Sequence, residues 1–160
     1  MTSPMLSRTV EALELMAQAE STVERLYETC AAQWQEDKDF WQGLALEEKN
    51  HWEHIRSMIS ILTGNPGNFL PGRSFNAIAL KTFISGIERD IESVTQFAMP
   101  ELNALRLAQD IEQALIEGRF TEVVQTEDKS FRALVDKIVL DTATHRWQVE
   151  KKIAQLQAKG

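Results

Sequence analysis

Apolar residues recur every three or four positions along most of this 160-residue chain, which is the spacing of one face of an α-helix. One apolar stripe runs from Leu6 to Trp34 and a second from Phe40 to Leu62, with a short polar break at 35–39 between them. No convincing alternation of apolar and polar residues, the pattern typical of a strand, interrupts them. The sequence therefore predicts an all-α protein.

A segment rich in glycine and proline, 64–74, is the one clear loop, and it separates the chain into two halves. The length of the chain is that of one domain. We expect a single domain made of two helical hairpins joined by a long crossover: hairpin one at 4–63, a loop and crossover helix at 64–99, and hairpin two at 100–159.

Local signals place the ends of the helices. Ser3 and Pro4 are typical of a helix start, with a capping hydroxyl and a proline at the first helical position. Pro100 should end the crossover helix, and Gly118 weakens the helix that contains it. In the second half of the chain, helices are predicted at about 75–98, 101–124 and 129–159.

Composition limits the class of protein and its partners. Hydrophobic residues make up 43% of the chain and charged residues 26%, which fits a soluble folded protein. The net charge of −7 argues against nucleic acid or an anionic membrane as the main partner. No apolar run approaches the roughly 20 residues that span a bilayer. The N-terminus also lacks the basic and then apolar pattern of a secretory signal, so we expect a cytoplasmic protein.

Cys30 is the only cysteine of the chain. A disulfide within the chain and a metal site built on four thiolates are therefore both excluded. Cys30 follows Leu26 and Tyr27 at helical spacing, so we interpret it as a buried structural thiol.

Acidic and imidazole side chains stand on the apolar stripes at matching places in the two halves. Glu20 is followed by Glu48 and His51, and Glu112 is followed by His145 at nearly the same separation. Carboxylates and imidazoles are costly to bury unless something compensates them, and a metal ion does so for such a cluster. The sequence therefore predicts a metal site inside a helical bundle.

The distances along the chain put these residues at one height. In an antiparallel helical hairpin, residues equidistant from the turn lie side by side. Glu20 and Glu48 are equidistant from a point close to the first polar break, and Glu112 and Thr142 are equidistant from a second break near residue 127. All four positions should lie near mid-helix and face one cavity.

Plainer interpretations stay open for several of these side chains. Glu48 and His51 could lie on the exposed face of a charged helix, and His145 could be a core histidine with a satisfied hydrogen bond. His54 fits a surface residue or one that contacts a metal ligand, and Glu24 fits the polar flank of the site. The four tryptophans, Trp34, Trp41, Trp52 and Trp147, fit core or interface packing.

Two motifs resemble a known family. In the first, a tyrosine follows a glutamate by seven residues; in the second, Glu-x-x-His ends an apolar helix segment. They are Glu20-Ser21-Thr22-Val23-Glu24-Arg25-Leu26-Tyr27 and Leu44-Ala45-Leu46-Glu47-Glu48-Lys49-Asn50-His51. Both are similar to motifs of the rubrerythrin-like branch of the ferritin-like superfamily, which are di-iron proteins built on an antiparallel four-helix bundle. The resemblance covers nearly the whole chain and is strongest in residues 10–60.

This resemblance implies a metal-binding function. The ligands would be Glu20, Glu48, His51, Glu112 and His145. The cofactor would be iron, possibly two ions per chain, with manganese or zinc as alternatives. The activity would be a non-haem iron oxidoreductase that couples oxidation of Fe(II) to reduction of peroxide or oxygen. The four-cysteine iron domain of the family is missing, so the electron donor would be a separate protein. Homodimerisation is expected, because bundles of this family often pair.

One position departs from the family pattern. Thr142 stands where the family has a glutamate, and threonine cannot bridge two irons as a carboxylate does. Asp141 is adjacent but rotated by about 100° around the helix, so it should reach the site only with distortion. The alternative is therefore a degenerate ferritin-like bundle that holds one metal or none and serves as a binding or structural module. A cage for iron storage is a third possibility.

Overall fold

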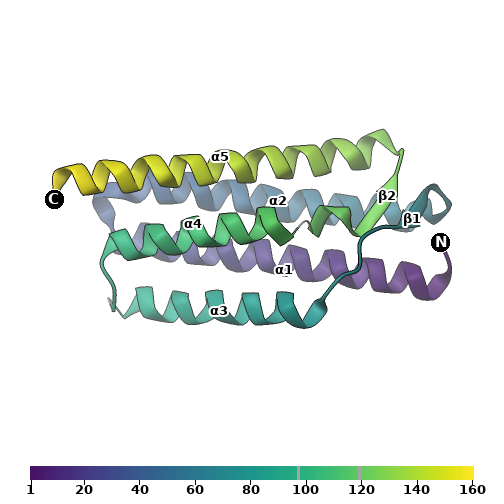
Figure 1. The fold of residues 1–160 in the computed structure, drawn as a ribbon, viewed down its shortest axis with the longest axis horizontal. Coiled ribbons are helices and arrows are strands. Elements are labelled where there is room, and N and C mark those ends of the chain that lie inside the picture. The colour runs from purple at the N-terminus through teal and green to yellow at the C-terminus, as the bar shows by residue number, and fades with distance from the viewer. Residues whose placement is uncertain (97, 119) are drawn as a thin grey trace.

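The computed structural model describes residues 1–96, 98–118 and 120–160, and it is mostly helical (Figure 1). Its elements follow the chain in this order: α1 (Ser3–Gln33), α2 (Lys38–Gly64), β1 (Phe69–Pro71), α3 (Ala77–Thr95), α4 (Glu101–Gly118), β2 (Val124–Thr126) and α5 (Lys129–Lys159). Short 3-10 turns lie at Gln35–Asp37, Pro66–Asn68 and Phe120–Val123. The all-α class predicted from the sequence fits this structure.

The helices lie side by side along the long axis of the molecule (Figure 1). α1 packs against α2 and α3, while α5 packs against α4 and α2. The chain therefore forms two hairpins, α1–α2 and α4–α5, which meet along α2 and α5. α3 is the crossover helix between them and packs on the first hairpin. None of the helices in residues 1–96, 98–118 and 120–160 is both long and apolar enough to cross a membrane.

Side-chain caps begin two of the helices. The Asn76 side chain accepts a hydrogen bond from the backbone N–H of Ala79 at 3.0 Å, and Asp128 does the same for Phe131 at 2.9 Å. The predicted cap at Ser3 is wrong. Ser3 is already helical, and the residue before it, Thr2, makes no side-chain capping bond.

The region after α4 differs from the prediction. The helix predicted at 101–124 ends at Gly118, and a turn and a short strand follow it. β1 and β2 pair antiparallel, with Phe69 opposite Thr126. A side chain at Gly72 would collide with the backbone carbonyl of Glu122, which explains the glycine beside this pairing. Strands of three residues are too short to show alternation in the sequence. Residues 97 and 119, which the predicted helices include, lie outside the described residues.

The buried apolar side chains form two clusters, separated at mid-helix by polar residues. In α1, Ala19 belongs to one cluster and Val23 to the other, with Glu20 between them. In α5, Ile138 and Val149 flank the polar positions in the same way. The buried residues between the clusters, here called the polar layer, are Glu20, Glu48, His51, Glu112, Thr142 and His145.

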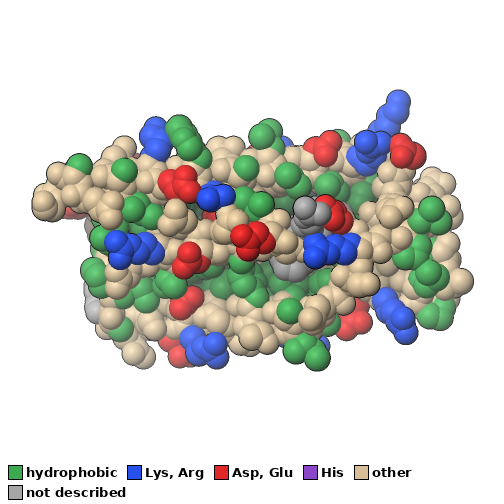
Figure 2. All heavy atoms as spheres, in the orientation of Figure 1, with side chains coloured by type: hydrophobic (Ala, Val, Ile, Leu, Met, Phe, Trp, Pro, Cys, Tyr) green, Lys and Arg blue, Asp and Glu red, His purple; other side chains and the backbone are tan. Residues whose placement is uncertain are grey.

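The surface is charged but mixed. On the face drawn in Figure 2, Lys and Arg side chains are interspersed with Asp and Glu side chains. The basic side chains visible there do not form the stripe that a nucleic-acid-binding face requires.

Candidate metal centre

The five side chains predicted as metal ligands are all buried and lie close together. Glu20 is 5% exposed, and the other four are 0% exposed. They form two groups of three whose ligand atoms lie within 4.8 Å of one another. The first triad is Glu20, Glu48 and His51, and the second triad is Glu48, Glu112 and His145. Both triads can hold a metal ion.

Glu48 belongs to both triads because its two oxygens face different histidines. Oε2 lies 3.3 Å from Nδ1 of His51, and Oε1 lies 2.9 Å from Nδ1 of His145. The two imidazole rings are stacked, with centroids 5.5 Å apart. Each Nδ1 also faces an outer glutamate: His51 lies 3.8 Å from Glu20, and His145 lies 3.7 Å from Glu112. The result is a nearly symmetric pair of half-sites around one carboxylate.

Two further carboxylates contact the outer nitrogens of the histidines. Nε2 of His51 lies 3.3 Å from Asp141 Oδ2, and Nε2 of His145 contacts Glu47. Each carboxylate reaches across from the opposite helix of the α2–α5 pair. A carboxylate on the outer nitrogen fixes the orientation of a metal-binding histidine, leaving the other nitrogen to face the metal. Asp141 is itself held by Lys137, whose Nζ donates to it at 2.7 Å.

Asp141 belongs to neither triad, which agrees with the expectation that it would need distortion to serve as a ligand. α5 is continuous through this residue, and its carboxylate contacts His51 on α2 rather than a group on its own helix. The role of Glu47 was not predicted from the sequence. A signal for both was present, since each stands four residues before a histidine: Glu47 before His51 and Asp141 before His145.

Burial and neighbouring charge determine how the metal-free site is protonated. Burial raises the pKa of Glu20 to about 8, and the Glu48 carboxylate adds to this rise. Burial alone lowers the pKa of His51, but the neighbouring carboxylates of Glu20 and Glu48 outweigh this and raise it to about 10. In the same way, Glu112 and Glu48 overcome burial and raise the pKa of His145 to about 11. At neutral pH these protons compensate the buried carboxylates.

Two buried carboxylate oxygens have no hydrogen-bond partner among the residues that the structure describes. They are Oε2 of Glu20 and Oε2 of Glu112, one in each triad. Unpaired buried oxygens are uncommon in proteins and call for an explanation such as an ion. The other oxygen of Glu112 accepts a hydrogen bond from Tyr27 at 2.6 Å. A cation would therefore fit the donors present in this layer.

Position 142, where the resembled family has a glutamate, holds no carboxylate. The Thr142 hydroxyl donates to the backbone carbonyl of Ile138 at 2.8 Å, so it is committed to its own helix. His54 lies outside both triads, with its ring centroid 6.5 Å from that of His51. Glu24 is also outside the triads.

The tryptophans differ in burial. Trp41 is fully buried, whereas Trp52 is 39% exposed and Trp147 is 56% exposed. Core packing, one of the two roles predicted for the tryptophans, is confirmed for Trp41. Cys30 is buried as predicted.

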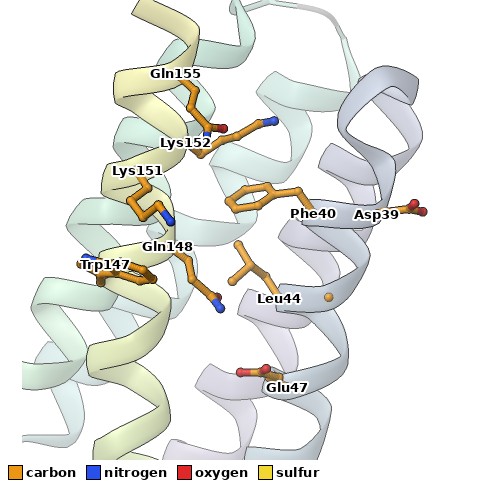
Figure 3. Close-up of a pocket in the computed structure, with 10 residues that line it drawn as sticks. Asp39, Phe40, Leu44, Glu47, Trp147, Gln148, Lys151, Lys152 and Gln155 are labelled. Atoms are coloured by element: carbon orange, nitrogen blue, oxygen red, sulfur yellow. The ribbon is translucent and has the colours of Figure 1, made fainter.

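A surface pocket leads to the outer side of the second triad. It has a volume of about 380 Å³ and lies between α2 and α5. Phe40 and Leu44 point into it from α2, facing Gln148 and Lys152 of α5 (Figure 3). Glu47 lines the same pocket, and its side chain is 43% exposed while it contacts His145. Glu47 therefore connects the buried imidazole with solvent.

Comparison with known proteins does not assign this chain to a family. No protein-family model, curated protein or solved structure matched it.

Proposed function

We propose that this chain is a rubrerythrin-related protein with a ferritin-like four-helix bundle, and that it binds iron in the polar layer. In this proposal α1, α2, α4 and α5 form the bundle. The first triad would hold one ion and the second triad another. The observation that carries the proposal is Glu48, whose two oxygens face two histidines in opposite half-sites. A bridging carboxylate between two metals needs that geometry.

The choice of metal follows from the donors. Carboxylates and imidazoles together suit iron, although the same set accepts manganese or zinc. When bound, iron would supply the electrons that reduce peroxide or oxygen. The chain itself would orient the ions through Glu20, Glu48 and Glu112 and fix the imidazoles through Asp141 and Glu47. Water and small oxidants would approach through the pocket beside Glu47.

A second candidate function rests on Thr142. Its hydroxyl is engaged with Ile138, so the second half lacks the carboxylate that would match Glu48. A chain of this kind would hold one ion or none and would act as a binding or structural module. Homodimerisation remains a prediction, and an external electron donor remains one for the iron oxidoreductase.

Metal analysis separates the two candidates. We expect protein purified without chelator, then loaded anaerobically with Fe(II), to retain about two irons per chain and to oxidise them on addition of peroxide. Glu48→Gln keeps the shape of the side chain but removes the shared charge, so it should abolish retention at both half-sites. Glu53→Gln, on the exposed side of the same helix, is the matched control and should bind iron as the wild type does.

Two results would refute the proposed centre: iron retention that Glu48→Gln leaves unchanged, or no retention by the wild type. Retention of about one iron per chain, lost in Glu48→Gln, would favour the one-metal module. Measurement of mass in solution would test the expected dimer against a cage.

A further inference from the structure

Three aromatic rings form a continuous row from the polar layer to the end of the molecule. Tyr27 contacts the metal centre through Glu112, and its ring lies 5.8 Å from that of Trp41. Trp41 in turn lies 6.3 Å from Trp34, which is half-buried. Trp34 follows α1 at the α1–α2 turn, at the same end as the C-terminus (Figure 1). The row therefore joins the buried site to the surface.

The two inner rings each have a carboxylate placed to take a proton. The Tyr27 hydroxyl donates to Glu112 at 2.6 Å, and Nε1 of Trp41 donates to Glu101 at 2.9 Å. Burial raises the pKa of Glu101, which makes its carboxylate a better proton acceptor. Tyrosine and tryptophan become far more acidic when they lose an electron, so a ring with a hydrogen-bonded base gives up its electron more easily. Aromatic packing alone does not require these two carboxylates.

We infer that Tyr27, Trp41 and Trp34 form an electron-transfer path that carries electrons from a donor at the α1–α2 turn to the metal centre. This inference rests on the proposed function, because peroxide must react at an iron held by one of the triads. Electron tunnelling slows steeply with distance, and rings in contact shorten each step. Trp52 and Trp147 lie outside the row, which makes them natural controls.

Electrons carried along this path would complete the reduction of hydrogen peroxide. Reduction of one hydrogen peroxide to two waters takes two electrons and two protons. If only one triad holds Fe(II), that ion would supply one of these electrons. Tyr27 supplies the second electron, and its phenolic proton moves to Glu112. The two protons that the peroxide requires come from solvent.

The remaining steps restore the rings. Trp41 reduces the tyrosyl radical while its indole proton moves to Glu101, and the proton on Glu112 returns to Tyr27. Trp34 then reduces Trp41, which recovers its proton from Glu101. A one-electron donor protein finally reduces Trp34. One electron has then passed from the donor to the peroxide, and every residue of the path has returned to its starting state.

Rapid freeze-quench spectroscopy tests the path in the loaded protein. Peroxide added to protein carrying one Fe(II) per chain should produce an electron paramagnetic resonance signal from a tyrosyl radical. Deuterated tyrosine would identify this signal, and it should be weaker with two Fe(II) per chain. Trp41→Phe should prolong its lifetime, because the tyrosyl radical can no longer be reduced by Trp41. Trp147→Phe, which changes an exposed ring outside the row, should behave as the wild type does.

A second measurement needs no metal and so separates this inference from the proposed function. Lys38→Cys places a reactive thiol at the exposed start of α2, four residues after Trp34, whereas the native Cys30 is buried. A ruthenium photo-oxidant attached there should oxidise Trp34 after a flash, and a tyrosyl radical should follow at Tyr27. Adding Trp41→Phe to the labelled protein should remove this tyrosyl signal, whereas adding Trp147→Phe should leave it intact.

An unchanged tyrosyl signal in the labelled Trp41→Phe protein would overturn the path. So would the absence of any tyrosyl signal in the labelled wild type. If the chain retains no iron but the flash produces a tyrosyl radical through Trp41, the proposed function fails while the path stands.

Discussion

Binding of divalent cations should expel about three protons from this chain at pH 7, because cations replace the protons that compensate the buried carboxylates. The pKa values of His51 and His145 are raised to about 10 and 11, so both imidazoles carry an extra proton at this pH. The pKa of Glu20 is raised to about 8, so most of this carboxyl is protonated at pH 7. Glu48 lies 3.3 Å from Nδ1 of His51 and is the second carboxylate that raises the pKa of this imidazole.

Calorimetry measures this number directly. Manganese(II) or zinc(II), which avoid redox chemistry, would be titrated into metal-free protein in several buffers at pH 7. The slope of the binding enthalpy against the ionisation enthalpy of the buffer gives the protons released. Protons compete with the metal, so the affinity should rise with pH throughout the range below about pH 8.

A single variant checks where the protons come from. Glu20→Gln cannot carry the carboxyl proton, so its release should fall from about three protons to about two. Release near zero in the wild type would refute the account, because the layer would then be unprotonated before the metal binds. Release of about two protons would mean that only the first half-site fills, because Glu20 and His51 both belong to it, and release of about one would mean that only the second fills.

Three further predictions follow from the polar layer. The metal-free chain should lose stability as the pH rises from about 5 to about 10. The raised pKa values of Glu20 and His51 make the folded state bind more protons than the unfolded state over this range. A lower urea midpoint at pH 9 than at pH 6 would show this. Tyr27→Phe should lower the free energy of unfolding by about 1–3 kcal/mol, since Glu112 loses its donor; an unchanged urea midpoint would contradict this. Asp141→Asn should weaken metal binding about 10–100-fold in a competition assay, whereas Asp136→Asn on the exposed side of α5 should not.

The helices and the height of the site could be predicted because both depend on periodicity. Glu20, Glu48, Glu112 and His145 interrupt apolar stripes at matching distances from the turns, and burial in a hairpin then brings them to one level. The paired strands β1 and β2 could not be predicted, since three residues carry no alternation. The early end of α4 follows from Gly118, where the prediction had let the helix continue.

The outer carboxylates were harder to predict for a different reason. The sequence analysis placed Asp141 by its angle on its own helix, whereas its contact lies on the neighbouring helix α2. Angular position on one helix does not determine which residue a side chain meets across an interface. Glu47 precedes His51, and Asp141 precedes His145, by the same four residues. This spacing predicts the two contacts only when α2 is known to pack on α5.

The two triads differ in when they can exist as the chain is synthesised. All donors of the first triad belong to the α1–α2 hairpin, so they are complete once His51 has left the ribosome and the hairpin has closed. The second triad shares Glu48 with the first, and its other two residues, Glu112 and His145, belong to the later hairpin. The first triad could thus bind an ion before synthesis of the chain is complete. An ion in the second triad would bind residues of both hairpins and so hold them together.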